Sequence, residues 1–559
     1  PQAAGLLDLH FVRRWRWPAA FLVAGALLTW IGALLRSKFI AVESNPDALL
    51  TIYCATNVDG LRGLTGCFPI VSQPALPPLL RHFFWYPLFG SQTELIHKVP
   101  SILYGHLNLV ACFLMGLTIF KGRPKQEMLL GASFGAMLAV LCPSEIVSAG
   151  DWRDYALISF TSTLFFWSIL TNPISPAFVA LSGGALINSH FFSVPFVLTV
   201  IGFVFFREWF QKRQGNALKL VAIFSLPAVA FAVFSGTVVL GMGTGKAYER
   251  PKIGMAWQEG IALLRGMIGL FSNDYLEWLK LPVFGVIMAI RRRNHNVQVV
   301  LVALIVVTVE FILIRSKSHY PWANRYYAPF FGLSAAAIMV LAREFMETLN
   351  FLSERWNAHS RYRFRYAALA LFVVINLLPT SIGDPLSELM RWDSLPPGNH
   401  TIVYRDFEML RRTQKPTLFV LTVQDEHTYP SVYLNTVDGA YTGGFHVARG
   451  PFRGDVEEYL KTYPDAQVVL MAGFSTSRAA KLNHEFRNLG LKSRFAGRIR
   501  LLQGLNGILI EKVSGKAEVL EVASLLGIPL TASDLAESKS DAGSGFYGYQ
   551  PLRGRGTRP

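Results

Sequence analysis

The sequence predicts a polytopic α-helical membrane protein that ends in a soluble α/β domain. Of its 559 residues, 52% are hydrophobic and only 16% are charged, and the mean hydropathy is +0.34. A soluble protein of this length carries more charge and fewer long apolar windows. Near Leu395 these windows give way to short strand-like runs that alternate with helix-like stretches, which indicates an α/β domain.

We predict about eleven membrane spans, because an apolar helix of about 20 residues crosses the hydrocarbon core. The windows are 17–35, 100–120, 126–142, 154–171, 176–188, 190–206, 219–240, 279–290, 298–314, 327–342 and 366–382. Two of them, 176–188 and 279–290, are short, so the count could change by one or two.

The distribution of charge predicts the orientation. The net charge is +16, from 53 basic and 37 acidic residues, and the basic residues recur between alternate spans. This positive-inside pattern places the N-terminus in the cytoplasm, and it argues against nucleic acid as the partner. An odd number of spans then places the C-terminal part outside. We therefore expect a multi-pass protein of the inner (plasma) membrane, with its C-terminal domain extracytoplasmic or periplasmic.

The chain divides into three predicted parts. Residues 1–390 form the membrane domain, with a first outer loop at 36–99, residues 391–515 form the α/β domain, and residues 516–559 form a helix and a disordered tail. The α/β domain should hold a largely parallel or mixed sheet. Its strand-like runs are TLFVLT at 417–422, QVVLMAG at 467–473 and NGILIEKV at 506–513.

The four cysteines indicate neither a disulfide scaffold nor a metal site. Cys112 and Cys142 fall in spans, where they are expected to pack. Cys54 and Cys67 share the first outer loop, where an oxidising compartment would permit a disulfide, and the sequence leaves that pairing open. No Cys/His spacing typical of a metal site occurs. We therefore assign no cofactor, and a divalent metal has no support in the sequence.

Acidic residues follow the first span, in the stretch VESNPDALLTIY. Glu43 and Asp47 lie here, with Asp59 further along. A carboxylate at the outer membrane surface can act as a general base on an acceptor hydroxyl. Residues 45–47 also resemble a helix start, so a helix cap is the alternative interpretation.

The segment Pro74–Leu107 holds more prolines and aromatic residues than a connecting loop needs. Its stretch LLRHFFWYPLF predicts a helix in the membrane interface that carries Arg81 and His82, with aromatic residues toward lipid. Lys98 precedes the Pro-Ser start of the next span. An interfacial anchor with basic residues toward the headgroups would show the same pattern.

The motif GDWRDYAL at 150–157 lies at the outer mouth of a span. The guanidinium of Arg153 can pair there with a lipid-linked phosphate or with an active-site carboxylate. An ion pair of Arg153 and Asp154 with their neighbours is the alternative.

The stretch INSHFFSVP separates two short apolar runs. If the runs are separate spans, His190 lies in an outer turn. If they are one helix, His190 is buried in the membrane and is a functional candidate.

A cluster of cations and aromatic residues lies at 315–330. This cluster runs against the positive-inside trend, so topology explains it poorly. Cations suit a phosphate and flat aromatic faces suit a sugar ring, so we favour a functional role. The cations are Arg315, Lys317, His319 and Arg325, and the aromatic residues are Tyr320, Trp322, Tyr326 and Tyr327.

The motifs described above, taken in their order along the chain and on the outer side of the membrane, resemble those of the GT-C superfamily of membrane glycosyltransferases. The resemblance is to its protein-mannosyltransferase-like branch in particular. Its PPL-to-LFG segment and its arginine-leucine-Pro-Ser span start match PPLLRHFFWYPLFG and HKVPSILYG, with Lys98 where arginine is usual. Its Arg-Pro-Tyr-Ala-Leu motif matches 153–157, with Asp154 replacing proline. Its His-aromatic span matches His190 and Phe191, and its Arg-Tyr-x-x-Pro motif matches 325–329. The similarity covers 15–345.

The resemblance implies a GT-C-like fold and an inverting transfer of a sugar from a polyprenyl-phosphate-sugar donor to a glycan, lipid or protein acceptor. It makes the acid of the first outer loop the base. The usual Trp-x-Asp-Glu is absent, and the nearest match is Val42-Glu43, so Glu43 is the leading candidate and Asp47 the second. The residues expected to bind substrate are Arg81, His82, Lys98, Arg153, Tyr155, His190, His319, Arg325 and Tyr326.

Three other classes compete with this one. A polysaccharide ligase or polymerase would use a lipid-linked donor and one large outer loop between late spans, for which 241–278 is the candidate. A transporter would carry charges near mid-membrane and broken helices in paired halves. We see neither paired halves nor clear mid-span acids, so this class ranks third. A non-catalytic membrane scaffold would fit the incomplete acidic motif.

Overall fold

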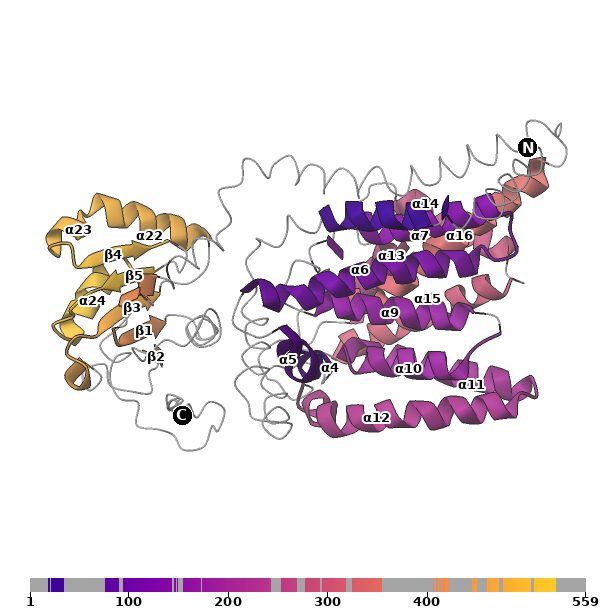
Figure 1. Ribbon diagram of the computed structural model, residues 1–559, viewed down its shortest axis with the longest axis horizontal. Helices are drawn as coiled ribbons and strands as arrows, with labels where there is room; N and C mark the ends of the chain where they lie inside the picture. Colours follow the sequence, from indigo (N-terminus) through magenta and orange to yellow (C-terminus); the bar gives the residue numbers. More distant parts are fainter. Residues whose placement is uncertain are drawn as a thin grey trace, which may run out of the picture. The chain divides into compact units, whose positions relative to one another are not determined.

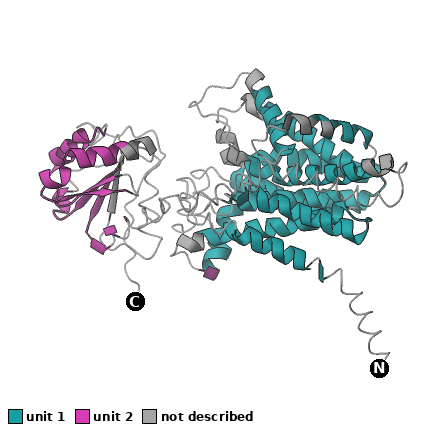
Figure 2. Cartoon of the chain, turned by 90° about the horizontal axis from the view of Figure 1, so that it is seen from above, with its two compact units in different colours: residues 1–40, 58–87, 98–394 teal, residues 41–57, 88–97, 395–559 magenta. Residues whose placement is uncertain are grey.

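The computed structural model in Figure 1 describes most of the membrane part and much of the C-terminal part. The described residues are 19–20, 22–34, 76–89, 94–142, 145–146, 148, 154–171, 173–242, 253–268, 277–291, 294–317, 324–353, 406, 409–410, 412–413, 415–421, 445–449, 460–471, 476–503 and 507–528. The chain divides into two compact units (Figure 2). The larger unit is 1–40, 58–87 and 98–394, and the smaller unit is 41–57, 88–97 and 395–559.

The larger unit is a bundle of helices that lie side by side (Figure 1). Its main helices are α6 (Glu94–Ile119), α7 (Lys125–Leu141), α9 (Tyr155–Leu170), α10 (Pro176–Ile187), α11 (Val194–Phe210), α12 (Gln214–Met242), α13 (Ile253–Ile268), α14 (Glu277–Ile290), α15 (His295–Lys317) and α16 (Phe331–Ser353). Apolar side chains from nearly all of them form one continuous buried core.

Within the described residues, five helical segments are long and apolar enough to cross a membrane. They are Lys98–Ile119, Phe191–Phe210, Gln214–Ser235, His295–Leu313 and Tyr327–Thr348. Three shorter apolar helices accompany them, at Leu22–Leu34, Tyr155–Leu170 and Pro176–Ile187. The prediction of a multi-pass helical membrane protein is therefore confirmed. The count of eleven spans stays a prediction, and the window 366–382 lies outside the described residues.

The two short apolar runs around INSHFFSVP form separate helices, α10 and α11. The one-turn 3-10 helix η3 (Phe191–Ser193) leads into α11. His190 begins this turn, and its Nδ1 accepts a hydrogen bond from the Phe192 N–H at 3.2 Å. Of the two arrangements considered for His190, the turn between helices is the one found.

The predicted outer loop 241–278 contains a further helix, α13, which packs against α15. A Cβ atom on Gly260 would lie 2.3 Å from Cγ1 of Ile312, so the two helices approach closely. Leu263 and Met267 of α13 are fully buried in the bundle core. The prediction of one long loop was wrong at these residues. The amphipathic pattern of α13 does not form a continuous apolar window, which is why the helix was missed.

Helices α9 and α16 pack tightly near the start of α16. A Cβ atom on Gly332 would lie 2.4 Å from the carbonyl oxygen of Ser162, so only glycine permits this approach. The Ser162 hydroxyl donates to the Pro329 carbonyl at 2.6 Å and accepts from the Gly332 N–H at 3.1 Å. This contact holds the 3-10 helix η4 (Asn324–Phe330) against α9.

The smaller unit contains a five-stranded mixed sheet with strand order β2-β1-β3-β5-β4. The strands are β1 (Thr417–Leu421), β2 (Phe445–Arg449), β3 (Gln467–Met471), β4 (Ile499–Leu502) and β5 (Gly507–Ile510). β1 pairs in parallel with β2 and β3, whereas β5 pairs antiparallel with β3 and β4. The helices described beside the sheet are α22 (Thr476–Asn488), α23 (Leu491–Arg494) and α24 (Lys516–Leu525).

Three of the five strands lie in the runs that the sequence singled out. β1, β3 and β5 are apolar and fully buried where their side chains are described, so they appear as continuous hydrophobic runs. β2 and β4 were missed. Their sequences FHVAR and IRLL contain charged or polar residues, and β2 and β4 form the two ends of the strand order. Edge strands need no continuous apolar run.

Candidate functional site

The segment before the second predicted span is helical and contains a π-helical turn. Its parts are α4 (Leu76–Leu80), the π-turn η2 (Arg81–Trp85) and α5 (Tyr86–Phe89). Wide turns of this kind are rare and often mark functional positions. Phe83 and Phe84 are 53% and 50% exposed, which fits the predicted outward-facing aromatics. Arg81 and Trp85 instead point inward and are buried, so a surface anchor does not describe these two residues.

Arg81 forms a buried ion pair with Asp154, the residue just before α9. Its Nη2 donates to Asp154 Oδ1 at 3.0 Å, and its Nε donates to Oδ2 at 3.3 Å. The exposed fractions of the two residues are 0% and 4%. Such bidentate pairing fixes the relative orientation of both side chains. It joins the π-turn to the mouth of α9 across 73 positions of the sequence.

Tyr86 completes the surroundings of this guanidinium. Burial opposes the charged form of Arg81, but the nearby oxygens of Asp154 and Tyr86 outweigh it and raise its pKa above the ordinary value. Desolvation of the phenol, partly offset by Arg81, raises the pKa of Tyr86 to about 12. Arg81 is thus a permanent cation and Tyr86 a neutral hydrogen-bonding group at neutral pH.

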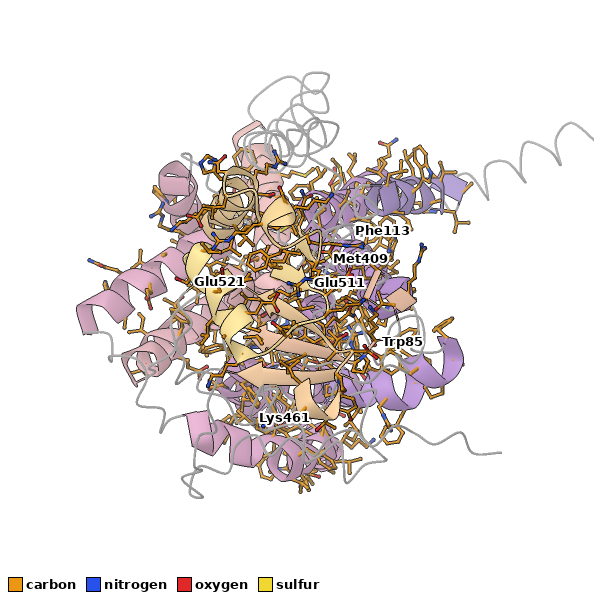
Figure 3. The ribbon with its side chains drawn as sticks, turned by 90° about the vertical axis from the view of Figure 1, so that its left-hand side faces the viewer. Trp85, Phe113, Met409, Lys461, Glu511 and Glu521 are labelled. Atoms are coloured by element: carbon orange, nitrogen blue, oxygen red, sulfur yellow. The ribbon has the colours of Figure 1, made fainter. Side chains whose placement is uncertain are left out.

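An aromatic contact ties the same turn to α6. The Trp85 Nε1–H donates to the Tyr104 hydroxyl at 2.8 Å, and the two rings meet edge to face at 5.8 Å between centroids. Trp85 is labelled in Figure 3. Ala156 and Leu157 of α9 pack against this pair. The π-turn, α6 and α9 are therefore joined by one buried cluster beside the ion pair.

Two polar residues are buried at the beginning of the apolar part of α6. Lys98 is only 1% exposed, and Ser101 is fully buried. Lys98 stands where the resemblance expects an arginine. A buried ammonium group needs polar or anionic partners, so its burial favours a role inside a site over one at the lipid surface.

A chain of buried hydrogen bonds lies further along α6. The Asn108 Nδ2 donates to Glu145 Oε2 at 2.7 Å, and the Asn108 Oδ1 accepts from the Thr163 hydroxyl at 2.6 Å. All three side chains are buried. Sequence reasoning missed this network. A lone Asn inside an apolar span was the signal that could have found it, because such a side chain needs partners.

The remaining predicted residues fall into three groups. Tyr155 is partly buried at the start of α9, and His82 and His190 are partly buried and in contact with neighbouring Phe rings. The backbone of Arg325 and Tyr326 belongs to η4, and their side chains are not among those that the structure describes. Outside the described residues altogether lie Glu43, Asp47, Cys54, Cys67, Arg153 and His319.

The described residues contain no group of three His, Cys, Asp or Glu side chains arranged to hold a metal ion. What they bring together is the π-turn, the beginnings of the apolar parts of α6 and α9, and η4. These contacts connect segments that carry four of the predicted motifs. Among the predicted binding residues, Arg81 is ion-paired with Asp154.

No protein-family model and no curated protein sequence matches the chain. Among solved structures, ArnT from Cupriavidus metallidurans bound to undecaprenyl phosphate is 11% identical, with a TM-score of 0.49 over 89% of this chain and 98% of that chain. Its apo state is 12% identical, with a TM-score of 0.48 over 92% and 99%.

A third solved structure is the archaeal oligosaccharyltransferase AglB from Archaeoglobus fulgidus, in complex with an inhibitory peptide and a dolichol-phosphate. It is 14% identical, with a TM-score of 0.28 over 80% of this chain and 58% of that chain.

Proposed function

We propose that this protein is an integral-membrane glycosyltransferase. It moves a sugar from a polyprenyl-phosphate-linked donor to a glycan, lipid or protein acceptor on the extracytoplasmic face, with inversion. The observation that supports this most directly is the Arg81–Asp154 pair. It joins the PPL-type segment to the Asp-Tyr-Ala-Leu stretch, two pieces that the resemblance assigns to one site.

The proposed reaction is a single displacement. Glu43 takes the proton of the acceptor hydroxyl, with Asp47 as the second candidate for this role. The acceptor oxygen attacks the anomeric carbon on the face opposite the phosphate, so the carbon–oxygen bond to phosphate breaks as the new bond forms. The lipid phosphate leaves with the electron pair, and the anomeric configuration inverts.

The leaving phosphate gains negative charge, so it needs cations placed in advance. We assign this role to Lys98, Arg153 and Arg325. Arg81 has a different role in this proposal, because its guanidinium is already bound by Asp154 and Tyr86. It positions the mouth of α9 and thereby Arg153. Residues assigned to the walls around the sugar and acceptor are His82, Tyr155, His190, His319 and Tyr326.

Label transfer from a radioactive polyprenyl-phosphate sugar by the purified protein tests the proposal. Glu43→Gln should abolish transfer with little loss of folded protein, because the amide cannot take a proton. Asp47→Asn tests the second candidate. Glu521→Gln is the matched control, because Glu521 is an exposed carboxylate of the smaller unit. Full activity of Glu43→Gln would move the assignment to Asp47, and the absence of transfer from every lipid-linked donor tried would reject the function.

Lys98 offers a sharper test of the phosphate site. Lys98→Met keeps much of the side-chain volume but removes the charge, so it should weaken donor use far more than acceptor use. The measurement is the Michaelis constant and turnover for each substrate. An unchanged dependence on donor concentration would remove Lys98 from the site.

The alternatives are less well supported. A polymerase would need a large outer loop between late spans, and residues 253–268 of that region form a helix packed in the bundle. A ligase or polymerase would move preassembled glycans, so product length separates it from a transferase that adds one sugar. A non-catalytic scaffold of the same fold would transfer no label.

A further inference from the structure

Glu310 is an ionisable side chain inside a membrane span. It lies in α15, within the apolar segment His295–Leu313. Glu310 lies three residues before the end of this segment, so the prediction that no clear acid lies at mid-span stays a prediction. A charged side chain in the bilayer is costly, so an ionisable residue there is a functional candidate unless something neutralises it.

The carboxyl group of Glu310 has one described hydrogen-bond partner. The Thr199 hydroxyl of α11 lies 2.5 Å from Glu310 Oε1. The second oxygen, Oε2, is buried, and no described atom is within hydrogen-bonding reach of it. Glu310 also lines a small cavity of about 10 Å³, room for about one water molecule. The other residues that line this cavity are Phe192, Phe196, Val307, Phe311 and Phe330, none of which is titratable.

Three buried carboxylates of the bundle have cationic partners. Asp154 is paired with Arg81, Glu208 with Arg207, and Glu344 with Arg291. Among the described side chains, none forms an ion pair with Glu310. Arg207 lines a neighbouring cavity on the same α11–α15 groove, but it lies eight residues from Thr199 along α11, a rise of about 12 Å.

The surroundings of the pair are apolar and face outward. Leu198 beside Thr199 is 49% exposed, and Val309 beside Glu310 is 48% exposed. In a membrane these side chains contact lipid tails. A carboxylate with one hydroxyl partner in such surroundings would bear an uncompensated charge, whereas a neutral carboxyl would not.

We propose that Glu310 is a proton-binding site within the membrane. Its carboxyl group carries the proton at neutral pH, with Oε1 accepting from Thr199 and the protonated Oε2 directed into the small cavity. This proposal does not depend on the proposed transfer reaction.

A neutral carboxyl group in lipid has a characteristic reactivity. The hydrophobic reagent dicyclohexylcarbodiimide takes the carboxyl proton on a nitrogen while the carboxyl oxygen adds to its central carbon. The acyl group then migrates to nitrogen and leaves a stable acylurea, with no leaving group. Carboxylates paired with arginine lack this proton and should not react.

The test uses the full chain in lipid nanodiscs at neutral pH, treated with dicyclohexylcarbodiimide or with a water-soluble carbodiimide plus an amine. Peptide mass spectrometry should find the hydrophobic adduct on Glu310 and not on Asp154, Glu208 or Glu344. The water-soluble reagent should modify exposed carboxylates such as Glu521, labelled in Figure 3, and leave Glu310 unmodified. Glu310→Gln should lose the hydrophobic adduct, and Glu521→Gln should retain it.

Labelling of the wild-type protein is sufficient to test the proposal, so the test does not depend on whether a variant folds. Infrared spectroscopy gives a second readout, because a protonated carboxyl has its own carbonyl band. That band should be missing in Glu310→Gln and present in Glu521→Gln. An unlabelled Glu310 in the wild type, or an unchanged band in Glu310→Gln, would show that the group is ionised and overturn the proposal. Neither readout depends on sugar transfer.

Discussion

The Asn108 Nδ2 donates a 2.7 Å hydrogen bond to the carboxylate of Glu145, and both side chains are buried. The bond joins the middle of α6 to the short segment between α7 and α9. Asn108 also accepts from Thr163 of α9, so one amide connects three parts of the bundle. A single substitution of Asn108 should therefore weaken the contacts among all three parts.

Asn108→Leu should destabilise the bundle, because it removes a donor from the buried Glu145 carboxylate and an acceptor from Thr163. A buried hydrogen bond contributes about 0.5–1.5 kcal/mol, and about 1.5–3 kcal/mol when one partner is charged. Thermal unfolding in detergent measures the loss. Asn488→Ala, at an exposed helix position of the smaller unit, is the control and should change little. Equal melting temperatures for wild type and Asn108→Leu would contradict the network.

Arg81→Met should be among the most damaging single changes in the bundle. It leaves Asp154 as an uncompensated buried charge, and breaking such a pair costs about 3–5 kcal/mol. The double variant Arg81→Met/Asp154→Leu should recover part of this loss, because it removes both charges. A double-mutant cycle on unfolding in detergent measures the coupling. If the two single changes add without coupling, the pair does not stabilise the fold.

Gly332→Ala should disrupt the α9–α16 contact. The new Cβ would lie 2.4 Å from the Ser162 carbonyl oxygen, so the backbone must move, at a cost of about 1–3 kcal/mol. Gly202→Ala in α11 is the matched control, since no atom lies within 4 Å of its Cβ position. Alanine there should be neutral or stabilising by up to about 1 kcal/mol. Similar effects at the two positions would show that the close approach is not formed.

The smaller unit should lose stability in acid through Glu518. Burial would raise its pKa, but the Ser514 N–H and hydroxyl, both at 2.8 Å, and Arg498 at 2.9 Å outweigh this and lower it. A carboxyl whose pKa is lowered by folding stabilises the fold fully above its unfolded pKa, about 4.3. That stabilisation is lost as the pH falls through the lower folded value.

Hydrogen exchange of peptides from β5 and α24 in the full chain measures this effect. Protection in the wild type should fall below about pH 4.3, after correction for intrinsic exchange rates. Glu518→Gln should lower the protection at neutral pH and flatten its dependence on pH. Glu521→Gln, which removes an exposed carboxylate of the same helix, should preserve the wild-type profile. A steep acid transition that persists in Glu518→Gln would assign the effect to another group.

Composition and local pattern were sufficient to predict the membrane class, most of the helices and three of the five strands. Length and apolarity are local properties, so windows such as 298–314 correspond to helices such as α15. The amphipathic α13 and the mixed strands β2 and β4 were not predicted, because their apolar residues form a face only after neighbours pack against them.

Only the tertiary structure decided which side chains meet. A sequence cannot show that Arg81 pairs with Asp154, since the two residues are 73 positions apart and each has charged or polar residues closer to it in the sequence. Nor can it show that Trp85 turns inward while Phe83 and Phe84 stay outside, because the π-turn alters the helical phase. The sequence shows that Glu310 lies in an apolar window. Its importance depends on the tertiary structure, because its buried Oε2 has no hydrogen-bond partner among the described residues. Pairing and desolvation are properties of three-dimensional surroundings, and they decide the chemistry of a buried charge.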